Sequence, residues 1–281
     1  MYNLKYISNQ GGEIILNYDY GYIVNTVGGA TGRGVELQTA QGYDQIGETL
    51  TGMSIGGQLI TISGRIPGQN TSAKTAMMRI FQPLTTGRLI WEDKYYIDVA
   101  VHTSPTLSQE RVSTFMLALY APYPYWQKIN QSRYELGGLT AEFSFPVNYA
   151  TPHRFGTTTI DTQFNALNAG DCAAQYTLTI TAGDSDLTNF KITDINTQRM
   201  IKFNGTLDAN SRLEMYRDAG QMYLKIDGTT DAFDMLDDTS DLFTLAAGDN
   251  VLLFTADSGA SAAKVSIVFN ESYVGVLADG V

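Results

Sequence analysis

The 281-residue chain contains 43% hydrophobic and only 17% charged residues, a balance that excludes a disordered chain and disfavours a charged helical bundle. Its 27 glycines, 17 tyrosines and 12 phenylalanines favour β-sheets, because aromatic side chains suit pleated surfaces and glycine suits the turns between strands. The net charge of −11 disfavours binding to nucleic acid or to anionic membranes, because like charges repel.

The length predicts two domains, and the charge is distributed unevenly between them. Residues 1–130 carry nine Lys and Arg and nine Asp and Glu, whereas residues 131–281 carry nine and twenty. The apolar periodicity lapses and the polarity rises just after the segment PYPYW, residues 122–126. We therefore predict an N-terminal domain over residues 1–130 and an acidic C-terminal domain over residues 131–281.

Alternating apolar side chains predict strands through most of the first 126 residues. The candidate strands cover residues 2–6, 12–18, 20–27, 59–66, 88–104 and 111–122. Residues 88–104 are predicted to form a hairpin with Glu92, Asp93 and Lys94 at its tip. The glycine-rich residues 28–57 interrupt this pattern. We interpret them as a long excursion or arm.

The pattern predicts a helix over residues 73–82. Ser72 is positioned to cap it, and Pro83 should stop it, because the residue before proline avoids the α region. The predicted buried face holds Ala73, Met77, Ile80, Phe81 and, beyond the helix, Leu84.

The last strand of the first domain is apolar on both faces. One face carries Val112, Met116 and Tyr120, and the other carries Phe115, Leu117 and Leu119. A strand of this kind is typical of a sheet that is covered on both sides.

Short strands recur in the second half at intervals of about ten residues, a spacing that indicates a β-sandwich or jelly roll. They cover residues 141–147, 175–183, 190–195, 199–205, 212–218, 221–227, 250–256 and 264–276.

The residue types that carry catalysis or bind metal are scarce. His102, His153 and Cys172 show no ligand spacing, the Gly-x-Ser-x-Gly pattern is absent, and the glycine-rich residues 28–34 lack the Gly-Lys-Ser/Thr ending of a phosphate-binding loop. The lone Cys172 cannot form an internal disulfide. We predict no catalytic site, no metal site and no cofactor.

The N-terminal sequence and the hydropathy also give expectations about location. The first ten residues lack a basic region followed by an apolar run, and no stretch approaches about 18 apolar residues. We therefore expect no secretory signal, no membrane span and synthesis in the cytoplasm.

Two clusters leave alternatives open. The acidic run from Asp231 to Asp241 is interpreted as a solvated loop, with calcium binding as the alternative. The aromatic side chains of Tyr123, Tyr125 and Trp126 are predicted to pack the two domains together, with sugar stacking as the alternative.

The order of elements in the first half resembles the N-terminal domain of the siphophage distal tail protein family. The resemblance covers residues 50–126 and rests on LITISGRI, the helix AKTAMMRIFQ with PLTTGRLI, KYYIDVAVHTSPTLS and FMLALYAPYPYW. In the second half, RMIKFNGTL and FTLAAGDNVLLFT are similar to strands of that family's C-terminal domain. The resemblance implies a mainly β protein, with an N-terminal β-sandwich-like domain containing one short helix and a C-terminal galectin-like β-sandwich of jelly-roll type.

The same resemblance implies a structural component of a phage or phage-like tail tip or baseplate, located in the virion. It implies a homohexameric hub ring that joins the tail tube protein, the tail-associated hub protein and receptor-binding or other baseplate proteins. Because flexible arms and exposed edges recruit partner chains, we expect inter-subunit or hub contacts at Arg33, Gln38, Glu92 and Lys94. The alternative function is a carbohydrate-binding adhesin module that contacts the host cell surface.

Overall fold

The structure, a computed structural model, describes residues 2–32, 34–68, 70–136, 139–140, 157–158, 163–218 and 220–277. The chain divides into two compact units, Met1–Asn130 with Ser272–Val281, and Gln131–Glu271. The last residues of the chain, predicted to lie in the second domain, therefore belong to the first unit. They do so because β23 (Ser272–Tyr273) pairs with β10 (Trp126–Lys128), and because Val276 is buried in the first core.

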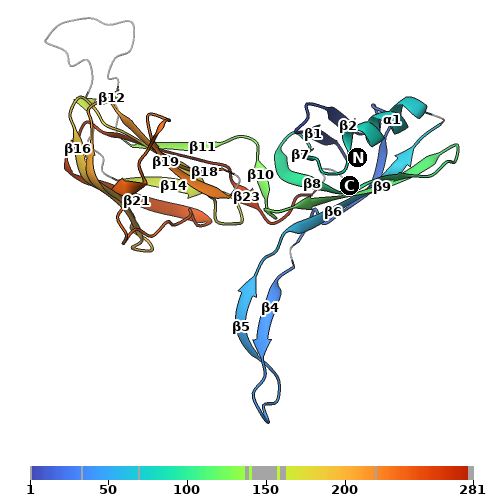
Figure 1. The fold of residues 1–281 in the computed structure, drawn as a ribbon, viewed down its shortest axis with the longest axis horizontal. Helices are drawn as coiled ribbons and strands as arrows, with labels where there is room; N and C mark the ends of the chain where they lie inside the picture. The colour runs from blue at the N-terminus through green and yellow to red at the C-terminus, as the bar shows by residue number, and fades with distance from the viewer. Residues whose placement is uncertain are drawn as a thin grey trace, which may run out of the picture. The chain divides into compact units, whose positions relative to one another are not determined.

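One antiparallel sheet of nine strands forms the first unit, in the order β2-β1-β7-β8-β9-β6-β3, with β10 paired to β8 and to β23 (Figure 1). Its strands are β1 (Leu4–Ser8), β2 (Glu13–Leu16), β3 (Ile23–Gly28), β6 (Gln58–Ile66), β7 (Thr86–Trp91), β8 (Tyr95–Leu107) and β9 (Ser113–Ala121), besides β10 and β23. The hairpin of β7 and β8 turns at Glu92 and Asp93, both with positive φ, at the predicted tip.

Helix α1 (Thr71–Ile80) packs on the core side of this sheet, where Met77 and the following Phe81 are fully buried. Its N-cap is Asn70, whose side chain accepts a hydrogen bond of 3.0 Å from the Ala73 amide. The predicted cap at Ser72 is wrong, because Ser72 already lies inside the helix.

Leu84 is fully exposed, so its predicted place on the buried face is also wrong. The helix ends at Ile80, and the backbone at Leu84 adopts a left-handed conformation with φ of 63°. This turn carries the side chain away from the core.

Aromatic side chains fill the first core. Tyr6 and Phe81 stack with their ring centres 4.5 Å apart, and Trp91 and Trp126 meet edge to face at 5.7 Å. Both tryptophans of the chain therefore lie in the first unit.

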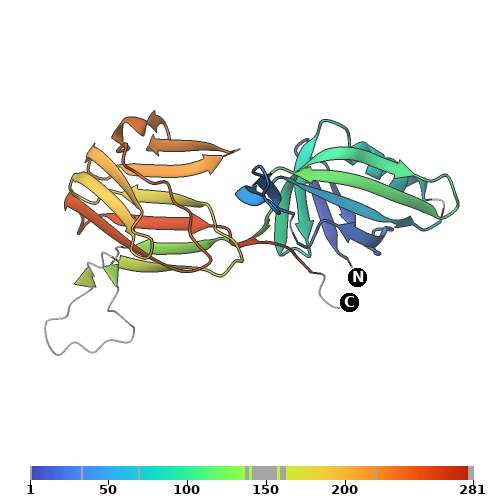
Figure 2. The ribbon, with the colours of Figure 1, turned by 90° about the horizontal axis from the view of Figure 1, so that it is seen from below.

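The second unit contains two antiparallel sheets that enclose a separate core (Figures 1 and 2). The six-stranded sheet has the order β11-β22-β15-β18-β19-β20 and the four-stranded sheet the order β14-β21-β16-β17. Their strands are β11 (Ser132–Leu136), β14 (Gln163–Asn168), β15 (Tyr176–Thr181), β16 (Leu187–Asp194), β17 (Met200–Leu207), β18 (Arg212–Asp218), β19 (Gln221–Ile226), β20 (Thr230–Asp231), β21 (Gly248–Ser258) and β22 (Lys264–Phe269).

The remaining elements are short. Strands β12 (Leu139–Thr140) and β13 (Thr157–Thr158) pair with each other, and η1 (Phe233–Met235) is a single 3₁₀ turn. The strand predicted over residues 141–147 lies outside the described residues. Strands β11 and β14 were not predicted.

The mainly β fold with one short α-helix is confirmed for the described part of the chain. Within the same residues, no helix is long and apolar enough to span a membrane.

The N-cap of α1 allows a direct test of the helix start. We expect Asn70→Ala to lower the free energy of unfolding of the first unit by about 1 kcal/mol, because the Ala73 amide loses its acceptor. Urea unfolding of the full chain, followed by tryptophan fluorescence, reports on the first unit, since both tryptophans lie there. Ser72→Ala is the matched control, and an equal loss in both variants would contradict the assignment.

Candidate assembly surfaces

A β-hairpin projects from the first unit as an arm, and it occupies the glycine-rich segment in which an arm was predicted (Figure 1). Its strands β4 (Glu36–Ala40) and β5 (Thr49–Ser54) pair only with each other. All residues of β4 are exposed, and at the tip Tyr43 and Ile46 are fully exposed. The arm therefore has no hydrophobic core of its own.

The arm is nevertheless amphipathic. Leu37 lies opposite Met53, and Thr39 lies opposite Leu50, so that apolar side chains share one face. The side chains of Leu37 and Met53 are 61% and 68% exposed. Glu36 and Ser54 face each other on the opposite, polar side. An isolated two-stranded hairpin with such a face is at best marginally stable in water.

The base of the arm is firmly held to the first unit. The carbonyl of Ala30 accepts hydrogen bonds from the Trp126 indole at 3.2 Å and from the Val276 amide at 3.0 Å. Gly29, with φ of 77°, runs so close to the Leu59 carbonyl that a Cβ atom would lie 2.2 Å from that oxygen. The start of the arm segment at Gly29 and Ala30 is thus fixed by close contacts with the first unit.

The second candidate surface is the face of the nine-stranded sheet opposite the core. Leu59 on β6 lies directly opposite Tyr120 on β9, and Met116 follows on the same face. These side chains are 43%, 40% and 57% exposed. The prediction that β9 is covered on both sides is therefore wrong for a single chain, because no described element packs on this face.

Hydroxyl groups and one internally neutralised ion pair surround these apolar side chains. Thr61 and Ser63 lie on the same face of β6. Arg88 and Asp98 form a two-pronged ion pair with N–O distances of 2.7 and 3.0 Å. Arg65 follows Ser63 on the same face of β6 and is exposed, so a partner that covers the whole face would also have to accommodate one cation.

Of the residues predicted to make inter-subunit or hub contacts, Gln38 lies on β4 and is exposed. Glu92 and Lys94 lie at the tip of the β7–β8 hairpin, where the Glu92 amide donates to the Asn3 carbonyl. Arg33 lies outside the described residues. Leu37, Met53, Leu59 and Met116 were not predicted as contacts, although their alternation with polar residues was visible in the sequence.

The aromatic segment before β11 serves the first core. Trp126 is fully buried there, and Tyr123 and Tyr125 contact each other edge to face at 5.5 Å. Packing of Tyr123 and Tyr125 between the two domains stays a prediction.

Cationic side chains hold the acidic segment of the second unit. Asp237 accepts hydrogen bonds from Lys202 and Asn204, each at 2.8 Å, and from Thr239. Arg199 pairs with Asp241 through two hydrogen bonds of 2.7 and 3.0 Å. The hydrogen bond from Lys202, followed by those from Thr239 and Asn204, lowers the pKa of Asp237 far below its ordinary value. Two of the carboxylates are therefore neutralised without a cation from solution.

The residues considered for metal binding do not come together in the described part of the chain. No three His, Cys, Asp or Glu side chains gather there as a metal site. His102 is exposed, with its Nδ1 3.0 Å from the Thr103 hydroxyl oxygen, and Cys172 is half-buried. His153 lies outside the described residues.

Comparison with known proteins finds similarity to phage tail proteins. Residues 153–273 match the family described as siphovirus-type tail component, C-terminal domain. The fold is similar to the crystal structure of the SPP1 Dit protein, described as a hub of the adsorption apparatus in phages that infect Gram-positive bacteria. That comparison has a TM-score of 0.70 and 12% identity, and it covers 96% of this chain and 98% of the other.

Two structures of the phage P2 baseplate in its activated conformation, with Ca and with Sr, match less closely. Their TM-scores are 0.46 and 0.45 at 11% and 12% identity, and they cover 95% and 100% of this chain and 98% and 100% of the other. No curated protein gives a match. The resemblance to distal tail proteins that the sequence indicated is confirmed.

The ion pairs of the acidic segment predict a pH dependence. Because the pKa of Asp237 is lowered in the folded state, its contribution to stability is present above the ordinary carboxyl pKa of about 4 and is lost as the pH falls below it. We expect Asp237→Asn to lower the melting temperature of the second unit at pH 7, and the difference from the wild type to shrink toward pH 2.

Scanning calorimetry measures this difference, and tryptophan fluorescence identifies the transition of the first unit. Asp238→Asn is the matched control, since Asp238 is exposed and takes part in none of these bonds. Equal behaviour of the two variants across the pH range would show that the ion pair with Lys202 contributes nothing.

Proposed function

We propose that this protein is a non-enzymatic structural subunit of a phage tail tip, and that six copies form a hub ring through their first units. The observation that carries the proposal is the uncovered apolar surface of the first unit, on the arm and on the outer face of its sheet. Single chains in water rarely leave such surfaces open, whereas subunits of an assembly do.

The arm and the sheet face are different surfaces of one subunit. A contact in which the arm of one copy lies on the sheet face of the next copy is heterologous, and such contacts close into a ring when the rotation between copies permits it. Covering one Leu or Met side chain fully contributes about 1.5 to 3 kcal/mol. Leu37 and Met53, which are 61% and 68% exposed, would together contribute about 2 to 4 kcal/mol before the entropic cost of association is subtracted.

The distribution of charge agrees with this arrangement. The first 130 residues carry equal numbers of cationic and anionic side chains, so that six copies can pack without accumulating repulsion. The acidic surplus lies entirely in the remaining residues, which favours a second unit that stays solvated and separate from its neighbours in the ring.

The proposed partners follow from this position in the virion. The ring would contact the tail tube protein on one side and the tail-associated hub protein on the other, and the second unit would hold receptor-binding or other baseplate proteins. The similarity of the fold to SPP1 Dit, which is described as an adsorption hub, supports the proposal.

Carbohydrate binding stays an untested alternative. A wide depression lies on the four-stranded sheet of the second unit, where Lys191, Lys202 and Asn204 are among its lining residues. The described residues that line it include no aromatic ring on which a sugar could stack.

The arm provides the main test of the ring. We expect the double variant Leu37→Ser with Met53→Ser to be monomeric at concentrations at which the wild type is hexameric, because the apolar face of the arm is lost. Native mass spectrometry and sedimentation velocity measure the particle mass. The double variant Glu36→Gln with Ser54→Ala changes the polar face of the same hairpin and should remain hexameric. A wild-type chain that stays monomeric at high concentration would overturn the ring.

The sheet face provides a second test. Met116→Lys places a charge on the centre of this face, and we expect it to weaken the ring at least tenfold, since that charge would have to be desolvated in the contact. Gln109→Lys adds the same charge in the exposed loop before β9 and serves as the control. A hexamer that dissociates at the same concentration in both variants would remove the sheet face from the contact.

A further inference from the structure

The balanced charge of the first 130 residues conceals an uneven distribution between the arm and the rest of the first unit. Residues 36–54, which form the arm hairpin, contain the acidic side chains of Glu36, Asp44 and Glu48 and no Lys or Arg. The rest of the first unit contains nine cationic and seven acidic side chains. The arm of one copy is therefore attracted to the body of another copy, whereas two arms repel each other.

Two cationic side chains lie unpaired at one end of the outer face of the nine-stranded sheet. Arg65 lies on β6 and Arg111 in the loop between β8 and β9, and both are exposed. Unlike Lys5 and Arg88 on the same face, neither forms an ion pair within the described part of the chain. Glu110 adds one negative charge to the same loop, which leaves a surplus of one positive charge among the three.

The same face is hollowed into an open trough of about 570 Å³. This volume lies within the range of about 300 to 1,000 Å³ for sites that take a ligand. Apolar side chains and hydroxyl groups share its lining, and among them are Ser63, Thr106, Ser108, Thr114, Met116 and Ala118.

Both unpaired cations lie next to this lining. Arg65 lies directly opposite Thr114, in the register of β6 and β9. The loop that contains Arg111 is closed by a hydrogen bond of 3.0 Å from the Ser108 amide to the Thr114 carbonyl. The trough is therefore bordered by positive charge at one end.

The tip of the arm has the complementary chemistry. Tyr43 and Ile46 are fully exposed there, so the arm does not fill the trough of its own chain. Asp44 lies between them in the sequence and Glu48 follows two residues after Ile46. Neither carboxylate forms an ion pair in the described residues. Two apolar side chains and two unpaired anions thus lie close together at the tip.

The arm is also long enough to bridge two copies. Seven residues separate Glu36 from Tyr43, and at about 3.3 Å per residue they span roughly 23 Å. The path of the sheet contains seven strands, and at about 4.8 Å between strands its width is roughly 30 Å. The arm therefore reaches about as far beyond its base as one sheet is wide.

We propose that the tip of the arm docks in the trough of the neighbouring copy, with its two apolar side chains against the lining and its two carboxylates beside Arg65 and Arg111. This inference rests on the proposed ring and specifies which part of the sheet face the arm contacts. The opposite charges of tip and trough make the contact directional, because an arm finds a partner only on the body of another copy.

The first test is the dependence of assembly on salt. Charges interact over about 8 Å at 0.15 M salt and over about 3 Å at 1 M, so exposed ion pairs weaken as salt is added. We expect the assembled wild type to dissociate at protein concentrations at least tenfold higher in 1 M than in 0.05 M sodium chloride. Sedimentation velocity measures the particle mass across this range.

The second test reverses the charges on each side of the contact. The trough variant combines Arg65→Glu with Arg111→Glu, and the tip variant combines Asp44→Lys with Glu48→Lys. Each variant alone should be monomeric where the wild type assembles, because like charges meet in every contact. An equal mixture should assemble into particles with three copies of each, since every contact then joins opposite charges. Native mass spectrometry resolves this composition.

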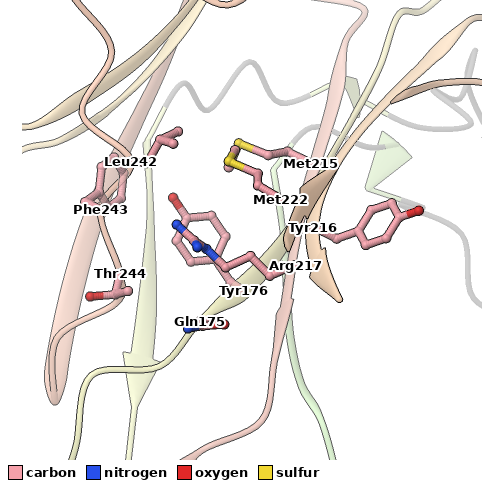
Figure 3. A pocket seen from close by; sticks show the side chains of 9 residues that line it. All are labelled: Gln175, Tyr176, Met215, Tyr216, Arg217, Met222, Leu242, Phe243 and Thr244. Carbon is pink, nitrogen blue, oxygen red and sulfur yellow. The ribbon is translucent and has the colours of Figure 1, made fainter. Parts of the chain in front are cut away.

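A matched control reverses two exposed cations of the second unit, which the proposed ring does not use. Arg217→Glu changes a side chain that borders a pocket on β18 (Figure 3), and Lys264→Glu changes one on β22. This double variant should assemble like the wild type. Tryptophan fluorescence should show the same melting transition of the first unit in all variants, since the changed side chains are exposed.

The outcomes separate this contact from the ring itself. A wild-type hexamer that is insensitive to salt, or that persists in either charge-reversed variant alone, would reject the tip contact and leave the ring standing. Two monomeric variants that fail to assemble when mixed would also reject it. A wild type that stays monomeric at every salt concentration would overturn the ring, and the tip contact with it.

Discussion

The first unit is governed by one constraint, which is that a sheet with two apolar faces must be covered twice. Helix α1 and the aromatic core cover one face of the nine-stranded sheet. The other face keeps Leu59, Met116 and Tyr120 in contact with water in the single chain. The arm has the same property, with Leu37 and Met53 exposed. Both surfaces are more easily explained as parts of an assembly than as parts of a solitary protein.

The base of the arm is held by the first unit. Trp126 and the returning C-terminal segment both bond to the Ala30 carbonyl, so the packing of the first core reaches the point where the arm begins. Beyond this base, β4 and β5 pair only with each other, so the rest of the arm is not held by the core. The core thus stabilises the first unit and also holds the base of the arm.

The second unit has its own hydrophobic core. Its acidic segment is held by Arg199 and Lys202, which explains how clustered carboxylates are tolerated there. The buried hydroxyl of Tyr176 differs from these carboxylates, since it has no hydrogen-bond partner among the described residues.

The sequence by itself determined most of the strands, the helix and the arm, because period-two and period-3.6 patterns and glycine density are local properties. Prediction from the sequence failed where one local pattern is compatible with two different structures. The apolar alternation of Met116 and Tyr120 indicates a covered face, but only the tertiary structure shows that nothing in the same chain covers it. The cap at Asn70, the outward turn at Leu84 and the burial of Tyr176 likewise depend on which segments meet in space. Contacts between residues far apart in the chain decide these features, and a single sequence does not contain them explicitly.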